Sequence, residues 1–484
     1  MRKRPSRAVV PALAASALFL AAGCSVSPAE SSSRADHARP AASSSARTDA
    51  GQPLAVAAAP EAAATSTAVA RPGTSGGRAH RAALKVTSYD SKTRRAVISP
   101  VHKSGSGDKA TGSPSSSSSA SPSAGSTAKP HGTAVGDVIA SAPAPGAPDG
   151  LLAKVTRVIG ESGDGTEVQT APTTLDALLG DDDAKGSVPV DPASFAIEKL
   201  LPDVQVSWAR NGDAHVGPEG AKVPLGSLRI DVGAKVATAP GAPASASASV
   251  SGFVQVAPDV DFSYGGDAAG SGPGAAYLGV SGDWDAQWTV KGRAAASAQP
   301  VRVPFAKLHA DPVLQVGPIP VVVNLDLTCY FQIAADGKVT VDVEQHLQGD
   351  FKAGGTFGPA QGWTPVDESH MTGSPVHTSV SAAGRVKAAL GAEATVGLYG
   401  AVGVSADLAP YLRGEAAGSA DVTTTTGSTA KTDGAATGSW ALYGGVDLTG
   451  TLRMQLSIFG TPVFQRAIPL GALHREWKLA DGHV

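Results

Sequence analysis

The sequence predicts an all-β protein whose long antiparallel strands form a large sandwich, a curved sheet or a wide barrel. From Val204 onward, apolar and polar residues alternate in runs of 11 to 19 residues, such as 323–333 and 440–458. A period of two places alternate side chains on a buried face and a solvated face, and ordinary strands have only about 5–6 residues. The 57 glycines and 35 prolines indicate long unstructured stretches or many turns. Alternation alone does not distinguish the three architectures, which stay open.

Length and charge exclude several other classes of protein. The chain has 484 residues, which corresponds to about three domains of ordinary size. Aromatic residues make up only 5% of it, and its formal net charge is −3. No basic face emerges, so nucleic acid is not an expected partner. A helical bundle, a polytopic membrane protein and a disulfide-stapled miniprotein are excluded as well.

Residues 1–23 have the features of a secretory signal peptide. Four basic residues precede an apolar run from Ala8 to Ala22, and the run ends in small residues. This run is too short to span a bilayer as a permanent helix, which needs about 20 apolar residues. We therefore expect export of the chain.

The end of this segment, Leu20-Ala21-Ala22-Gly23-Cys24, resembles the lipobox of bacterial lipoproteins, with Ala21 where Leu is commonest. The resemblance implies that the Cys24 thiol receives a diacylglycerol and that the chain is cut before Cys24. The cut removes four basic residues and lowers the net charge from −3 to −7. Two acyl chains suffice for stable anchoring, whereas one holds only marginally. The expected location is the outer face of the cell membrane.

Cys329 is then the only free thiol, so no intrachain disulfide is possible. It lies in an alternating strand among apolar residues, where a small buried hydrophobic side chain is the ordinary role.

Composition divides the mature chain into four parts. Residues 24–83 are rich in Ser, Ala, Pro and Thr and predict a disordered tether. Residues 84–180 predict a small β-domain, which begins with a hairpin over 84–99, carries a Ser-rich insertion at 104–131 and closes with a helical turn at 174–179. Residues 181–203 predict a helical connector that starts at Asp191 and Pro192 and ends at Leu201. Residues 204–484 predict the large antiparallel β-domain.

Within the large domain the alternation predicts strands over 277–291, 323–333, 386–404 and 440–458. Asp336-Gly337 predicts a hairpin turn that returns the chain through 339–343. The small polar residues of 423–438 predict a solvated loop. Trp284 and Trp288 share the apolar face and are expected in the core.

The chain shows none of the common catalytic or metal-binding motifs, and Ser-x-x-Lys occurs only in low-complexity or loop sequence. We predict no catalytic residue, no metal ligand and no cofactor, and enzyme activity stays open. Asp283 and Asp285 share one strand face at about 6.6 Å, which is within reach of a glycosidase carboxylate pair but also ordinary on a solvated face. His370 and His377 match no common metal spacing.

Three aromatic residues are candidates for ligand binding. Trp363 lies outside any alternating run, which predicts an exposed side chain. Tyr399 and Tyr443 have the parity opposite to the core and are expected to face a ligand or another sheet.

Three segments, Val135–Val138, Gly317–Val323 and Trp440–Tyr443, resemble a group of uncharacterised secreted lipoproteins of high-G+C Gram-positive bacteria. The resemblance implies location and β architecture, and no activity. We expect a membrane-anchored extracytoplasmic lipoprotein that acts as a non-catalytic binding or structural module. Its expected partners are the membrane, through the anchor, and a cell-wall glycan, lipid or surface protein. The alternatives are an envelope-polymer hydrolase and a lipid-binding amphipathic β carrier.

Overall fold

The computed structural model describes residues 53–61, 65–71, 78–101, 133–163, 165–209, 215–217, 220–222, 227–237, 246–266, 273–294, 298–425, 431–432, 437–453, 458–460 and 467–483. Cys24 and the Ser-rich insertion at 104–131 lie outside these residues. The described residues form antiparallel strands almost throughout, which confirms the predicted all-β class. Among them, no helix has the length and apolar character needed to cross a membrane.

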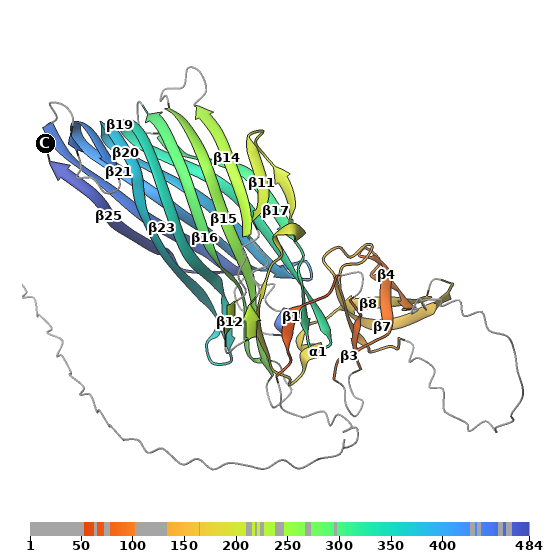
Figure 1. The fold of residues 1–484 in the computed structure, drawn as a ribbon. Coiled ribbons are helices and arrows are strands. Elements are labelled where there is room, and N and C mark those ends of the chain that lie inside the picture. The colour runs from red at the N-terminus through yellow and green to blue at the C-terminus, as the bar shows by residue number, and fades with distance from the viewer. Residues whose placement is uncertain are drawn as a thin grey trace, which may run out of the picture. The chain divides into compact units, whose positions relative to one another are not determined.

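A seven-stranded sheet forms the smaller of the two main sheets (Figure 1). It has its own core around Val86, Ile98 and Val155. The predicted hairpin over 84–99 is confirmed as β4 and β5, and the Asp90 carboxylate accepts a hydrogen bond from Thr93 Oγ1 at 2.7 Å in its turn. In sheet order the strands are β3 (His80–Arg81), β2 (Ala68–Ala70), β6 (Val138–Ser141), β7 (Leu151–Ser162), β8 (Gly165–Pro172), β5 (Arg95–Pro100) and β4 (Leu84–Asp90).

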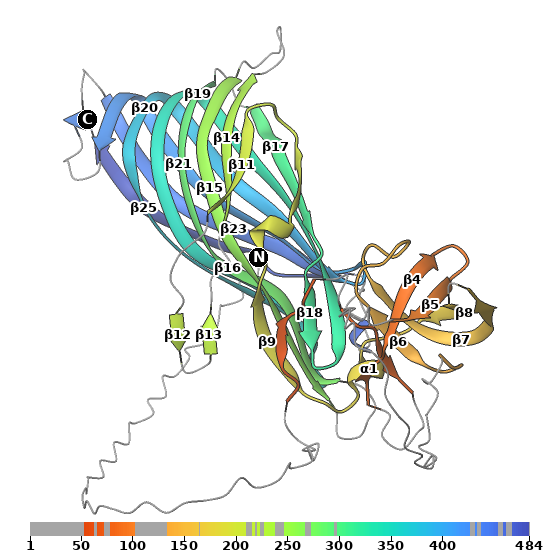
Figure 2. The same ribbon diagram turned by 45° about the vertical axis from the view of Figure 1, so that its right-hand side comes forward.

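A sixteen-stranded antiparallel sheet contains most of the remaining chain, and Figure 2 shows its long strands side by side and the sheet curving. Side chains from β16 and from β23 belong to one hydrophobic core, so the sheet curves around its apolar face. A two-stranded ribbon pairs β12 (His215–Gly217) with β13 (Gly220–Lys222). The strands of the large sheet are β1 (Val56–Ala58), β9 (Ala184–Pro189), β10 (Ala196–Lys199), β11 (Val204–Ala209), β14 (Ser227–Ala237), β15 (Ala246–Gly266), β16 (Pro273–Ala294), β17 (Ala298–Ala310), β18 (Val313–Val316), β19 (Ile319–Gly358), β20 (Gly362–Leu398), β21 (Ala401–Thr425), β22 (Lys431–Thr432), β23 (Thr437–Arg453), β24 (Ala467–Pro469) and β25 (Leu473–His483).

The predicted core residues are buried. Trp284 is 6% exposed and Trp288 is 2% exposed. Phe331 and Cys329 lie on the same apolar face of β19, and burial raises the pKa of the Cys329 thiol to about 12. On the opposite face of β16 the side chains include Asp283, Asp285 and Gln287, which are polar as the alternation requires.

The expectation of a disordered tether is wrong for part of 53–83. β1 pairs with β18, while β2 and β3 belong to the seven-stranded sheet. The three residues of β2 are at most 5% exposed. Alanine and valine therefore form a buried strand here, although their Ala-rich surroundings resemble a linker in composition.

The connector over 181–203 is not helical. The Asp191 carboxylate accepts from the Ala193 amide at 2.9 Å, so the predicted cap is present, but it starts only a single 3-10 turn over Pro192–Ser194. β10 follows and pairs with β17, and β9 pairs with β15. Edge pairing with the large sheet outweighs the local helix signal. The helical turn predicted at 174–179 is confirmed as α1 (Asp176–Leu179).

The predicted hairpin at Asp336-Gly337 is wrong, because β19 runs through both residues. β17 pairs with β19 up to Ala335, and β16 pairs with it from Val339 onward. Gly337 has φ +96°, which an L side chain rarely adopts. The Asp-Gly pair thus marks the point where β19 exchanges one neighbour for another.

The run over 386–404 is two strands and not one. β20 ends at Leu398 and β21 starts at Ala401, and the two residues between them, Tyr399 and Gly400, have φ values of +49° and +77°. Positive φ at both positions is typical of a tight two-residue hairpin turn. β21 then continues to Thr425 into the predicted polar loop, part of which lies outside the described residues.

Candidate functional site

The solvated face of the large sheet carries tyrosines that lie over glycines of the neighbouring strand. Tyr330 is directly opposite Gly391, and Tyr411 is directly opposite Gly445. A β-carbon at either glycine would lie closer to the tyrosine ring than real Cβ atoms approach. Both tyrosines are at most 2% exposed, although they lie on the polar face. Glycine is therefore required where the aromatic ring covers the sheet.

Charged side chains hold these rings. The Arg302 guanidinium lies 3.5 Å from the centroid of Tyr330, whose hydroxyl donates to Asp407 at 2.6 Å. Tyr411 donates to Glu476 at 3.0 Å. These pairs are structural, because each partner is already engaged within the sheet.

Tyr443, a predicted ligand-binding residue, faces away from the core as expected. The Arg413 guanidinium lies 4.0 Å from its ring centroid, and its hydroxyl donates to Glu415 at 3.1 Å. Arg413 also donates to Glu476 at 2.6 and 2.8 Å. These hydrogen bonds lower the pKa of Glu476, and they lower the pKa of Glu415 although burial opposes them.

Trp363 is not exposed, so the predicted aromatic platform is wrong. Its side chain is 6% exposed and its ring lies 5.7 Å from the rings of Phe357 and Phe459. Trp363 is directly opposite Phe357 in the pairing of β19 with β20. The sequence around it lacked a visible alternation because β20 had only just begun.

Tyr399 is half-buried and packs against the core. Its hydroxyl donates to the Pro320 carbonyl, and burial raises the pKa of its phenol. It therefore serves the turn between β20 and β21 rather than a ligand.

A groove lies on the solvated face where β14, β15, β16, β19 and β20 run side by side. It encloses about 500 Å³. Most of the side chains that line it from this face are polar, namely acids, carboxamides, hydroxyls and one imidazole: Ser227, Gln255, Asp283, Asp285, Gln348, Asp350, His370 and Thr372. Ala257, Trp284, Gly349 and Met371 complete the lining.

The groove is acidic. Asp283 of β16 is directly opposite Asp350 of β19, and directly opposed like charges destabilise a sheet. Asp350 contacts His370 at 3.1 Å, and Asp285 contacts His346 at 2.7 Å. Among the described residues, no Lys or Arg forms an ion pair with these three acids. The groove thus presents hydrogen-bond acceptors without a fixed cation.

The groove does not contain a recognisable nucleophile. Gln255 donates to the Ser227 hydroxyl at 2.5 Å, and no histidine contacts that serine within the described part of the chain. The paired carboxylates are the one arrangement in the groove with catalytic precedent.

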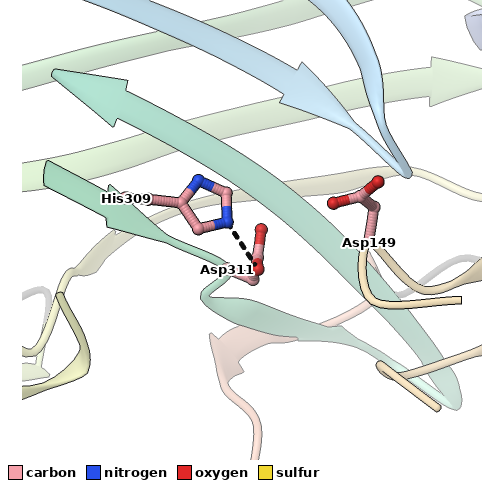
Figure 3. Close-up of side chains that lie close together, drawn as sticks. All are labelled: Asp149, His309 and Asp311. Carbon is pink, nitrogen blue, oxygen red and sulfur yellow. Dashed lines mark hydrogen bonds and ion pairs between the residues drawn. The ribbon is translucent and has the colours of Figure 1, made fainter. Parts of the chain in front are cut away.

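A second polar cluster joins the two sheets. Asp149 lies in the loop between β6 and β7 of the smaller sheet, whereas His309 and Asp311 lie at the end of β17 (Figure 3). One ligand atom from each lies within 4.8 Å of the other two. His309 Nε2 contacts Asp311 at 2.9 Å, and His309 Nδ1 contacts Asp326 at 2.7 Å. Burial opposes the charged imidazole, but both aspartates outweigh it and raise the pKa of His309.

The sequence alone predicts part of the groove, but it does not predict the cluster of Asp149, His309 and Asp311. The alternation places Asp283 and Asp285 on one solvated face. The position of Asp350 opposite Asp283 follows from the register between β16 and β19, which the sequence does not show. Asp149 and His309 are 160 positions apart and have no shared motif.

Comparisons with known proteins give no independent guide to either site. No protein-family model, no curated protein and no solved structure matches this chain. The chemistry of the groove and of the cluster therefore has to be argued from their geometry alone.

Proposed function

We propose that this chain is a lipid-anchored extracytoplasmic protein that acts as a non-catalytic binding module of the cell envelope. The observation that carries the binding role is the acidic groove of about 500 Å³ across five strands of the solvated face. The lipobox-like sequence that ends in Cys24 supports the location.

The chemistry of the groove favours a ligand rich in hydrogen-bond donors. Its carboxylates and carboxamide oxygens accept hydrogen bonds, and a carboxylate forms stronger ones than a neutral group does. The ligand class we propose is the cell-wall glycan with its peptide side chains, which offers hydroxyl, amide and amino donors. A lipid anchor at the membrane surface holds the groove near that polymer.

Cosedimentation with insoluble cell-wall sacculi tests this function. The mature full-length protein in detergent should pellet with the sacculi. The double variant Asp283→Asn, Asp350→Asn should bind at least about 10-fold more weakly, because each lost charged acceptor is worth about 1.5–3 kcal/mol. The substitution also removes a like-charge pair, which favours the fold, although it weakens the contact of Asp350 with His370.

Asp342→Asn is the matched control. Asp342 is an acid on the solvated face of β19, the strand that also holds Asp350. It forms an ion pair with Lys291 at 3.0 Å and does not line the groove. It should leave binding unchanged. Equal binding by wild type and the groove variant, or no cosedimentation of the wild type, would contradict the proposed function.

Hydrolysis of the same polymer is the second candidate function, and the opposition of Asp283 and Asp350 favours it. Two carboxylates that flank a sugar bond at about 5–10 Å are the requirement for glycoside hydrolysis. Incubation of sacculi with the protein, followed by an assay for new reducing ends, distinguishes the two. Release that is lost in Asp350→Asn supports the hydrolase, and no release supports the binding module.

The carrier alternative has less support. The side chains of the apolar face belong to one buried core, in which Trp288, Phe331 and Leu448 are at most 2% exposed. We therefore place ligand binding on the solvated face.

A further inference from the structure

We propose that Asp149, His309 and Asp311 bind one divalent transition-metal ion, for which Zn²⁺ is the best-fitting ion. Within the described ranges they are the one group of three His, Cys, Asp or Glu side chains that is close enough to share an ion. This site lies apart from the groove, so the inference does not depend on the proposed function.

The distances suit metal ligation with little movement. One atom from each of the three side chains lies within 4.8 Å of the other two. Zn²⁺ binds imidazole nitrogen and carboxylate oxygen at about 2.0–2.2 Å, which places ligand atoms roughly 3–4 Å apart. Figure 3 shows the Asp149 carboxylate beside the pair formed by His309 and Asp311. Small rotations of these side chains would bring them into ligand positions.

Outer partners already orient the ligands. His309 Nδ1 bonds to the Asp326 carboxylate at 2.7 Å, which leaves Nε2 directed at the cluster. Asn324 is 8% exposed and donates to Asp311 Oδ1 at 2.7 Å, which leaves Oδ2 toward His309. A histidine ligand whose second nitrogen is held by a carboxylate, beside a carboxylate ligand that is itself hydrogen-bonded, is the usual surrounding of a bound metal.

The charge of the cluster also favours a bound cation. Three carboxylates, Asp149, Asp311 and Asp326, surround one imidazole. In the part of the chain that the structure describes, no Lys or Arg forms an ion pair with any of them. A dication would neutralise the two carboxylates that face each other.

The ligand set selects the class of ion. An imidazole nitrogen suits zinc and other transition metals, whereas Ca²⁺ and Mg²⁺ prefer oxygen ligands alone. Asp149 comes from the loop between two strands of the smaller sheet, β6 and β7, and the other two ligands come from the end of β17. The bound ion would therefore tie the two sheets together.

Metal binding by the mature full-length protein tests the inference. After treatment with a chelator, titration with Zn²⁺ should show one site per chain. Asp149→Asn should weaken this binding at least about 100-fold, and Asp326→Asn, which alters an outer partner, should weaken it about 10–100-fold. X-ray absorption of the zinc-loaded wild type should show nitrogen and oxygen ligands at about 2.0–2.2 Å, one of them an imidazole.

His474→Gln is the matched control, because His474 also contacts an aspartate across strands, Asp447 at 2.6 Å, but lies outside the cluster. It should bind Zn²⁺ as the wild type does. Circular dichroism of each variant before titration shows that it is folded. The absence of a stoichiometric zinc site, equal affinity in Asp149→Asn, or binding of Ca²⁺ alone would overturn the inference.

Discussion

Alanine at Gly391 should destabilise the protein through the ring that covers this glycine. The added β-carbon would meet three atoms of the Tyr330 phenol, the ring carbons Cζ and Cε1 and the hydroxyl oxygen Oη. The ring cannot simply move aside, because Arg302 lies 3.5 Å from its centroid and its hydroxyl donates to Asp407 at 2.6 Å. Overpacking of this kind costs about 1–3 kcal/mol, and the fixed ring predicts the upper part of that range.

Urea unfolding followed by circular dichroism measures this cost. Gly160→Ala is the control, because Gly160 also lies in a strand, at an exposed position, and a β-carbon there meets nothing within 4 Å. It should be neutral or stabilise slightly, since alanine restricts the unfolded chain. In a Tyr330→Ala background, Gly391→Ala should cost almost nothing, which gives a coupling energy of about 1–3 kcal/mol. A Gly391→Ala variant as stable as Gly160→Ala, or strict additivity with Tyr330→Ala, would refute the reasoning.

Three further predictions concern stability and reactivity. Trp288→Ala should lower the free energy of unfolding by about 3–5 kcal/mol, because the side chain is 2% exposed, and an unchanged urea midpoint would reassign it to a surface. Hydrogen bonds from Arg413 lower the pKa of Glu476. This pair therefore stabilises the fold fully at pH values above the usual glutamate pKa of about 4.3. The stabilisation is lost as the pH falls through the lowered pKa of Glu476. The difference in urea midpoint between wild type and Glu476→Gln should therefore be constant from pH 7 to about pH 5 and shrink below about pH 4; a difference that grows with acid would contradict the ion pair. The Cys329 thiol, with its pKa raised to about 12 by burial, should react with a thiol reagent only after unfolding, and rapid labelling of the native protein would show that it is accessible.

Period-two alternation predicted the fold class because it reports burial of one strand face directly. It located β16 and the first part of β19 and assigned Trp284, Trp288 and Cys329 to the core. Alternation carries no information on which strands pair, and the wrongly predicted hairpin at Asp336-Gly337 follows from this. Asp336-Gly337 has the local chemistry of a turn, yet both residues lie within β19 and pair with β20.

Local signals also failed where the large sheet supplied the partner. The Asp191 cap is present, but β10 pairs with β17 and ends the helical turn. In the Ala-rich segment before residue 84, β2 is buried by pairing with β6. In both places long-range strand pairing outweighs the local sequence signal.

The candidate sites could be predicted only in part, for the same reason. Two acids of the groove lie two positions apart on one strand, which a single sequence reveals. Asp350 joins them through strand register, and Asp149 joins His309 through contact between two sheets. A single sequence does not show which positions lie side by side in the fold, so it predicts neither contact.

The most direct test of the whole account is the mass of the mature N-terminal peptide, isolated from the membrane fraction. We predict a peptide that starts at Cys24 and carries a thioether-linked diacylglycerol on its sulfur, and a Cys24→Ser protein that no longer fractionates with the membrane. An unmodified sulfur, a different first residue, or unchanged membrane association of Cys24→Ser would contradict the claim that this protein is a lipid-anchored module of the cell envelope.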